Sequence, residues 1–179
     1  MMNQLEQLTS RIKPIRLLLL DVDGVLTDGR IIIDDAGTET KNFNVKDGHW
    51  LRMLMGFGME VIIITGRTSR VVEHRARDLG IVELYQGVRN KVAVFQELLK
   101  RKALLPEEVA FIGDDLIDAP LLRRVGFAAT VADATEVVKD NVHYVARAGG
   151  GRGGVREICE LIIRGQGKWQ EVLDLYELA

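Results

Sequence analysis

The strongest constraint on the fold is a run of four leucines that ends in two aspartates. Leu17 to Leu20 form a continuous apolar stretch of strand length, and Asp21 and Asp23 follow it directly. A strand that is apolar on both faces is typical of a parallel sheet covered by helices on each side. Because aspartates are rarely buried without a partner, the two carboxylates predict a bound group at the end of this strand.

Apolar runs of strand length alternate with helical patterns along the whole chain. Further strands are predicted at 59–65 and 109–115, with weaker ones at 125–132 and 142–146. Apolar residues three and four positions apart predict the helices between them, over residues 48–58, 69–80, 90–105, 116–126 and 134–141. This alternation predicts one α/β domain over residues 1–179, a doubly wound, Rossmann-like, mostly parallel sheet with helices on both faces.

Two segments depart from the alternation. Residues 29–45 contain two strand-like runs around the turn sequence Asp34–Gly37, which predicts a β-hairpin inserted after the first strand. The tail, residues 165–179, has Trp169 and Val172 at helical spacing with Leu173 and Tyr176, which predicts a last amphipathic helix. That helix either packs on its own domain or reaches a neighbouring subunit.

Composition excludes several classes of protein. The formal charge of −2 favours no nucleic-acid partner, and no apolar run reaches the roughly 20 residues of a membrane span. The single cysteine, Cys159, forms no intrachain disulfide and fits a reducing compartment. We therefore expect a cytoplasmic protein without membrane partners.

Polar side chains follow each strong apolar run. In an open parallel sheet, ligands bind beyond the carboxyl ends of the strands, so these side chains are expected to meet at one edge. The set comprises Asp21 and Asp23, then Thr65, Gly66 and Arg67, then Asp114, Asp115 and Asp118, with Lys91 at the start of a predicted helix.

Crowded carboxylates repel one another unless a cation lies between them, and oxygen ligands suit Mg²⁺. Threonine, lysine and arginine bind phosphate oxygens, so the set predicts phosphoryl transfer through an aspartyl-phosphate. We expect Asp21 to be the nucleophile and Asp23 the general acid and base, with Thr65 and Lys91 contacting the phosphoryl group. Asp114 is expected to bind the metal, with Asp115 and Asp118 as further ligands or support.

In this order, the motifs resemble those of the haloacid dehalogenase superfamily of phosphatases. The first motif reads DVDGVLTDG, the second IIITGR, the third is Lys91, and the fourth reads GDDLIDAP. The resemblance implies a magnesium-dependent phosphatase, with metal ligation by Asp21, the backbone carbonyl of Asp23, and Asp114.

Spacing indicates a site without a cap domain. The interval from Asp21 to Thr65 holds the hairpin, one helix and one strand, and the interval from Thr65 to Lys91 holds one helix and one strand. Neither leaves room for the cap that encloses the substrate in most of the superfamily. A second copy of the chain is the simplest closure for such an open site.

A finer resemblance covers residues 43–67 and 148–163, which are similar to the 3-deoxy-D-manno-octulosonate 8-phosphate phosphatase family. It implies an enzyme of lipopolysaccharide biosynthesis that assembles as a homotetramer and whose site is completed by neighbours. Arg67 would then contact the sugar acid, with Lys46 and Asp47 reaching it across an interface, and the chain departs from the family pattern at His49-Trp50. The glycine-rich loop around Arg152 is either a substrate clamp or a plain turn.

Three alternatives stay open at this stage. A phosphatase for nine-carbon sugar-acid phosphates of the deaminoneuraminate 9-phosphate type shares the same capless pattern. A phospho-accepting receiver domain also carries carboxylates, Thr and Lys, but its phosphoacceptor ends the third strand, whereas the strand before Thr65 ends in no aspartate. An inactive scaffold is disfavoured because every catalytic position is filled.

Overall fold

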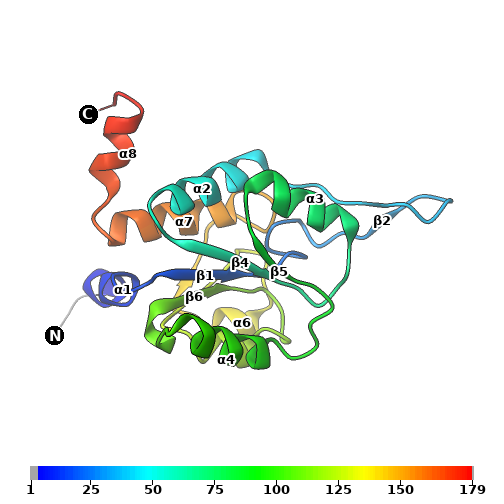
Figure 1. The fold of residues 1–179 in the computed structure, drawn as a ribbon, viewed down its shortest axis with the longest axis horizontal. Helices are drawn as coiled ribbons and strands as arrows, with labels where there is room; N and C mark the ends of the chain where they lie inside the picture. Colours follow the sequence, from blue (N-terminus) through cyan, green and yellow to red (C-terminus); the bar gives the residue numbers. More distant parts are fainter. Residues whose placement is uncertain (1–3, 179) are drawn as a thin grey trace.

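A six-stranded sheet forms the centre of the structure, a computed structural model that describes residues 4–178 (Figure 1). Every strand pairing in this sheet is parallel. The order is β5-β4-β1-β6-β7-β8, and the strands span Glu83–Tyr85, Glu60–Ile64, Leu17–Leu20, Val109–Ile112, Phe127–Thr130 and Tyr144–Val145. The central position of β1 explains why its four leucines are apolar on both faces.

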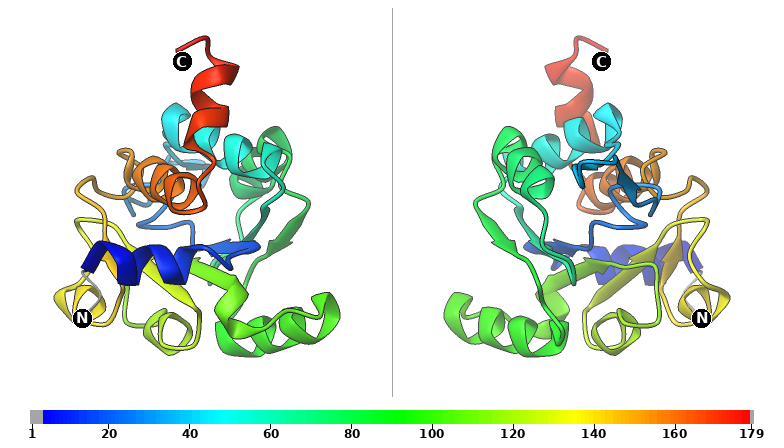
Figure 2. Two further views of the ribbon diagram at one scale, coloured as in Figure 1. Left: turned by 90° about the vertical axis from the view of Figure 1, so that its left-hand side faces the viewer. Right: turned by 90° about the vertical axis from the view of Figure 1, so that its right-hand side faces the viewer.

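Alternate leucines of β1 enter two different cores. Leu18 and Leu20 pack in one core, and Leu17 and Leu19 in the other. The first core is covered by α1 (Gln4–Ile12), α2 (Val45–Gly56), α3 (Arg70–Leu79) and α7 (Gly154–Gly165), and the second by α4 (Lys91–Lys102), α5 (Ala119–Leu122) and α6 (Glu136–Lys139). The two end views show these layers on opposite faces of the sheet (Figure 2). The predicted doubly wound α/β fold is confirmed.

Two predicted helices are shorter than their sequence pattern. Helix α5 covers only Ala119–Leu122 of the predicted 116–126, and α6 only Glu136–Lys139 of 134–141. The residues before α5 form a hydrogen-bonded turn in which the backbone N–H of Asp118 donates to the Asp115 carbonyl at 2.9 Å. This turn takes the place of the first helical turn that the apolar spacing predicts.

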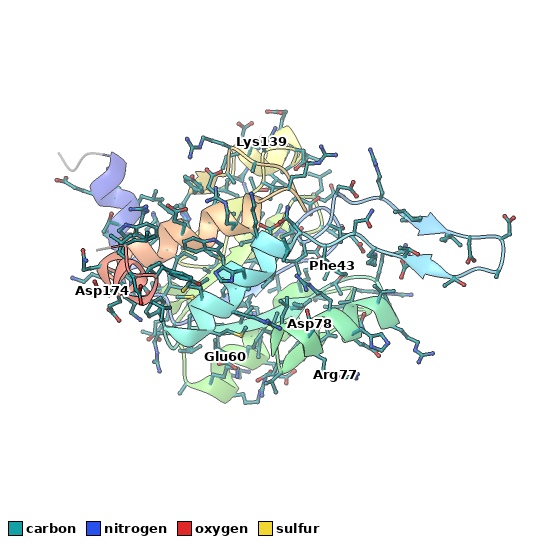
Figure 3. The ribbon with its side chains drawn as sticks, turned by 90° about the horizontal axis from the view of Figure 1, so that it is seen from above. Phe43, Glu60, Arg77, Asp78, Lys139 and Asp174 are labelled. Atoms are coloured by element: carbon teal, nitrogen blue, oxygen red, sulfur yellow. The ribbon has the colours of Figure 1, made fainter. Side chains whose placement is uncertain are left out.

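The inserted hairpin is confirmed and projects from the domain (Figures 1 and 3). Its strands β2 (Ile32–Ile33) and β3 (Glu39–Thr40) are antiparallel. The Asp34 carboxylate accepts from the backbone N–H groups of Ala36 at 3.0 Å and Thr38 at 2.7 Å, which fixes the turn. Ile33 is 58% exposed, so the hairpin presents apolar surface outside the core.

The tail forms α8 (Trp169–Leu175), as the amphipathic spacing predicts. Trp169 stacks on Trp50 of α2 with ring centroids 6.2 Å apart, and Tyr176 Oη lies 2.9 Å from His49 Nε2. In this structure the tail therefore packs on its own domain, and the His49-Trp50 pair supplies that contact. Residues 1–3 and 179 of the predicted domain lie outside the described residues. Among the residues described, no helix combines the length and apolarity that crossing a membrane requires.

Candidate active site

The register of the three central strands brings their polar ends to one edge. Leu20 of β1 pairs with Ile63 of β4 on one side and with Ile112 of β6 on the other. The backbone N–H of Asp21 donates to the Ile112 carbonyl at 3.0 Å, which continues the ladder one residue beyond β1. The side chains after β1, β4 and β6 are therefore neighbours, as predicted from the parallel fold.

Asp21 is held at the end of β1 by two fixed contacts. Its carboxylate accepts from the Val22 backbone N–H at 2.7 Å and forms an ion pair with Lys91 Nζ at 2.7 Å. Burial raises the pKa of Asp21, while the Lys91 ammonium opposes that shift. The carboxylate that the sequence predicts as nucleophile is only 5% exposed, and both of its oxygens have a partner.

Lys91 starts α4 and is itself buried, 5% exposed. Its Nζ bridges Asp21 and Asp118, at 2.7 Å and 2.6 Å. Burial alone would lower the pKa of Lys91, but the two carboxylates raise it above its ordinary value, so the lysine remains a cation.

Asp118 holds the turn after β6 through hydrogen bonds to its backbone. Its side chain is fully buried, and one oxygen accepts from the backbone N–H groups of Asp114 at 3.0 Å and Asp115 at 3.4 Å. The other oxygen binds Lys91. The sequence left Asp118 as either a further metal ligand or a support of the site, and these contacts favour the supporting role. Asp115 is exposed at the edge of the site.

Asp114, at the same edge of the sheet, has a carboxylate oxygen without a partner in the described chain. Its Oδ1 is buried and has no hydrogen-bond partner among the described residues. Burial, with the negative charges of Asp118 and Asp21, raises the pKa of Asp114 to about 7. A Cβ at Gly24, where φ is +90°, would overlap the Asp114 carboxylate, so this glycine is required for the approach of the two segments.

The cluster fits a divalent cation. Carboxylate oxygens of Asp21, Asp114 and Asp118 lie within 4.8 Å of one another. Three carboxylates facing the single charge of Lys91 leave two negative charges, which a divalent cation neutralises. The orphaned Oδ1 of Asp114 marks where such a cation would gain a ligand, and an all-oxygen donor set suits a hard cation such as Mg²⁺.

Asp23 lies on the other side of the site, in a second set of charges. Lys41 Nζ is 2.5 Å from Asp23 Oδ1, and Arg67 Nε is 3.6 Å from Asp23 Oδ2. Glu39 joins the same two cations, with its Oε1 at 3.4 Å from Lys41 Nζ and 2.9 Å from Arg67 Nη2. Sequence reasoning missed Glu39 and Lys41. Glu39 lies in β3 and Lys41 two positions later, a spacing that places both side chains on one face of an extended chain, but nothing in the sequence says that this face meets the site.

A cavity of about 280 Å³ lies between the carboxylates of Asp21 and Asp114 and the pair formed by Asp23 and Arg67. It is lined by Asp21, Asp23, Gly24, Gly29, Thr65, Gly66, Arg67, Asp114, Asp115 and Ile117. A larger hollow of about 460 Å³ lies at the opposite strand ends, around Arg16 and Lys102, and contains none of the predicted catalytic residues. We assign the chemistry to the smaller cavity because the carboxylates converge there.

Three predicted substrate contacts are not part of the cavity lining in the described chain: Lys46, Asp47 and Arg152. Lys46 and Arg152 are exposed. Asp47 is 1% exposed, and its two oxygens accept from the backbone N–H groups of Gly153 at 3.3 Å and Arg156 at 2.7 Å. Within its own chain Asp47 therefore anchors the start of α7, and its substrate contact across an interface stays a prediction.

The glycine-rich loop is a close-packed turn. A Cβ at Gly150 would overlap the backbone carbonyl of Gly24, and the Gly151 N–H donates to the Val25 carbonyl at 3.0 Å. These glycines allow two backbones to touch. The sequence left this loop as either a substrate clamp or a plain turn, and its backbone contacts are those of a plain turn.

Comparison with known proteins agrees with this geometry. Residues 77–156 match the haloacid dehalogenase-like hydrolase family. The chain is 50% identical over 157 residues to the 3-deoxy-D-manno-octulosonate 8-phosphate phosphatase of Escherichia coli K12, covering 88% of this chain and 84% of that protein. The Yersinia pestis phosphatase of the same name is 47% identical over 163 residues, 91% of this chain and 87% of its own.

Solved structures show the same fold. The Moraxella catarrhalis 3-deoxy-D-manno-octulosonate 8-phosphate phosphatase, in complex with magnesium, phosphate and the sugar acid, superposes with a TM-score of 0.93 at 38% identity, covering 95% of this chain and 98% of that one. A cobalt-bound Haemophilus influenzae phosphatase gives a TM-score of 0.85 at 37% identity, covering 88% and 92%.

The fold and site define a capless phosphoric monoester hydrolase that uses a divalent metal. The chain belongs to the haloacid dehalogenase-like hydrolases, within the 3-deoxy-D-manno-octulosonate 8-phosphate phosphatase family. This membership excludes the receiver-domain alternative.

Proposed function

We propose that this protein hydrolyses 3-deoxy-D-manno-octulosonate 8-phosphate to the free sugar acid and phosphate, with Mg²⁺ as cofactor. The observation that carries the proposal is the buried Asp21, held by Lys91 beside the orphaned oxygen of Asp114. The named relatives support the substrate, and the Moraxella catarrhalis complex with magnesium, phosphate and the sugar acid supports the metal.

In the first step, a carboxylate oxygen of Asp21 bonds to phosphorus while the bond from phosphorus to the sugar oxygen breaks. The electron pair of that bond goes to the sugar oxygen, which takes a proton from Asp23. Lys91 offsets the charge on Asp21 as the phosphoryl group approaches, and Thr65 with the N–H of Gly66 binds phosphoryl oxygens. Asp21 then carries the phosphoryl group as an aspartyl-phosphate.

In the second step, water attacks phosphorus and gives a proton to Asp23, while the bond from phosphorus to the Asp21 oxygen breaks and its electron pair returns to the carboxylate, which releases phosphate and restores Asp21. Asp21, the backbone carbonyl of Asp23, and Asp114 would hold the cation. When bound, a divalent cation neutralises the carboxylates and the phosphoryl oxygens in the same small volume.

The carboxylate of the sugar acid would bind Arg67, which lines the cavity and keeps 46% of its side chain exposed. A guanidinium recognises a carboxylate through parallel hydrogen bonds. Lys46 and Arg152 are exposed, so they remain available to a substrate held between two copies of the chain.

We propose further that the protein is a cytoplasmic homotetramer with no nucleic-acid partner. The projecting hairpin supports assembly, because Ile31 and Ile33 are 57% and 58% exposed on a segment that its own domain does not cover. The formal charge of −2 provides no net electrostatic attraction for nucleic acid.

The test is a substrate screen with metal-stripped protein, with and without added Mg²⁺, scored by free phosphate. The eight-carbon sugar-acid phosphate, its nine-carbon analogue and a neutral hexose phosphate form the panel. We expect the highest kcat/KM on the eight-carbon compound. A preference for the nine-carbon acid would replace the substrate assignment, and no release from any compound would overturn the proposal.

A matched pair of variants tests the role of Arg67. Arg67→Gln should raise KM for the acid sugar about 10-fold or more and leave KM for the neutral sugar nearly unchanged, because only the acid loses a charge-assisted hydrogen bond. Arg77→Gln, at an exposed position of α3, should change neither.

A further inference from the structure

Lys41 is a buried lysine outside the known motifs. It follows β3 directly, and its side chain is only 1% exposed. Removing an ammonium from water is strongly unfavourable unless opposite charges surround it. No apolar core requires a lysine at the base of a hairpin, so its burial needs another explanation.

The explanation lies in a closed ring of four charges. Lys41 contacts Asp23 and Glu39 at 2.5 and 3.4 Å, and Arg67 contacts the same two carboxylates at 3.6 and 2.9 Å. Each oxygen of Asp23 thus faces its own cation, Lys41 at Oδ1 and Arg67 at Oδ2. The shortest of the four contacts is the one between Lys41 and Asp23.

The two cations of the ring differ in access to substrate. Arg67 lines the cavity, and its side chain is 46% exposed, whereas Lys41 is not among the lining residues and is 1% exposed. A substrate carboxylate that binds Arg67 draws it away from Asp23 Oδ2. Lys41 has no route to the substrate and stays on Oδ1.

We propose that Lys41 is the positioning residue for the acid–base carboxylate. This inference rests on the proposed phosphatase function. Lys41 fixes Oδ1 of Asp23 so that Oδ2 faces the reacting oxygen and carries the proton. Within the described residues, Lys41 and Arg67 supply the side-chain contacts to this carboxylate, in contrast to Asp21, whose carboxylate also accepts from the Val22 backbone N–H.

The arrangement couples the hairpin to the chemistry. The strands of the hairpin are two residues each, and Lys41 is the first residue after the second of them. A shift of the hairpin base moves Lys41 and therefore the orientation of Asp23. Figure 3 shows the hairpin extending away from the domain, with Phe43 at its base.

The test exploits the leaving group. An alkyl oxygen needs a proton as its bond to phosphorus breaks, whereas p-nitrophenolate leaves as a stable anion without one. Loss of a correctly placed general acid therefore slows aspartyl-phosphate formation from the sugar phosphate but not from p-nitrophenyl phosphate. Hydrolysis of the intermediate still needs Asp23 as base, so the nitrophenyl ester should show a burst of one equivalent of nitrophenolate.

We expect Lys41→Met to lower kcat for the sugar phosphate about 100-fold, with KM changed less than about threefold. With enzyme in excess, the first turnover of p-nitrophenyl phosphate should release nitrophenolate at the wild-type rate. With substrate in excess, the variant should show this release as a burst followed by a slower steady state. Lys41→Gln should fall between Met and wild type, and Lys41→Arg should recover most of kcat. The control is Lys100→Met, an exposed lysine near the far end of α4, which should behave as wild type.

Two results would overturn the proposal: an unchanged kcat on the sugar phosphate in Lys41→Met, or an equal slowing of that reaction and of the nitrophenolate burst. The second would mean that Lys41 only holds the fold. If Lys41→Met does not fold, the Gln and Arg variants give the same comparison. If the wild type hydrolyses other alkyl phosphates but not this sugar phosphate, the substrate assignment fails and the Lys41 test runs on those esters.

Discussion

Two regions of the molecule bury carboxylates, and they treat them differently. Where α2 meets the start of α7, Asp47 of α2 accepts hydrogen bonds from two backbone N–H groups. Glu157 of α7 accepts from Tyr144 Oη at 2.7 Å and from the Arg147 backbone N–H at 3.1 Å. At the strand tips, Asp114 Oδ1 is buried with no partner in the described chain. Backbone N–H groups and a tyrosine hydroxyl satisfy the carboxylates at α7, as expected of groups that hold the fold, whereas the orphaned oxygen of Asp114 indicates a missing ligand.

The largest expected effect follows from Asp21→Asn. The amide has the shape of the carboxylate but cannot accept the phosphoryl group, so phosphate release should fall by a factor on the order of 10⁴. The midpoint of thermal unfolding should move by less than about 4 °C. A variant that keeps more than about a tenth of the wild-type rate would remove Asp21 from the role of nucleophile.

Lys91→Met should damage both activity and stability. It leaves Asp21 and Asp118 buried without their shared cation, which should lower the free energy of unfolding by about 3–5 kcal/mol in metal-free buffer. Urea unfolding with EDTA and with Mg²⁺ measures this loss, and the metal should restore part of it. Equal stability of Lys91→Met and Lys100→Met in EDTA would show that the buried charges are balanced in another way.

Asp47→Asn separates anchoring of the fold from chemistry. It weakens the two backbone hydrogen bonds to α7 and should cost about 1–3 kcal/mol of stability. Below the unfolding temperature, phosphate release should stay within about twofold of wild type. A raised KM with unchanged stability would instead support the substrate contact that the sequence predicts.

The smallest effect is a pH-dependent one at Glu157. Burial alone would raise the pKa of Glu157, but hydrogen bonds from Tyr144 and from Arg147 lower it below the ordinary value of 4.5. The unfolded chain therefore takes up the proton first as pH falls, so this group stabilises the fold at neutral pH and loses that contribution in acid. Glu157→Gln should be about 1 kcal/mol less stable at pH 7.

Urea unfolding across the acid range checks the sign of this effect. The gap between wild type and Glu157→Gln should shrink as pH falls below roughly 4.5. A gap that widens in acid would contradict the pKa direction.

The sequence predicted what depends on the parallel sheet. Once β1, β4 and β6 are parallel neighbours, Asp21, Thr65 and Asp114 must share an edge, and no further information is needed to place them together. The hairpin also followed from local signals, because the Asp34–Gly37 turn is fixed by its own side chain and a glycine at φ +79°.

The rest depended on contacts between distant segments. The sequence did not predict Lys41 and Glu39 as site residues. Tertiary packing decides which face of the hairpin is turned toward the sheet, and no local sequence pattern indicates it. Asp47 was expected at the substrate from the family resemblance alone, and its backbone contacts to α7 join segments more than a hundred residues apart, which no local pattern indicates. His49 and Trp50 found their partners in Tyr176 and Trp169, more than a hundred residues away along the chain.

The central claim is that Asp21 becomes phosphorylated during turnover. A single turnover quenched in acid and reduced with borohydride converts an aspartyl-phosphate to homoserine, which peptide mass spectrometry locates in the chain. We predict homoserine at position 21 after reaction with the eight-carbon sugar-acid phosphate, and none in Asp21→Asn. Unmodified Asp21 during active turnover, or homoserine at another carboxylate, would contradict the account.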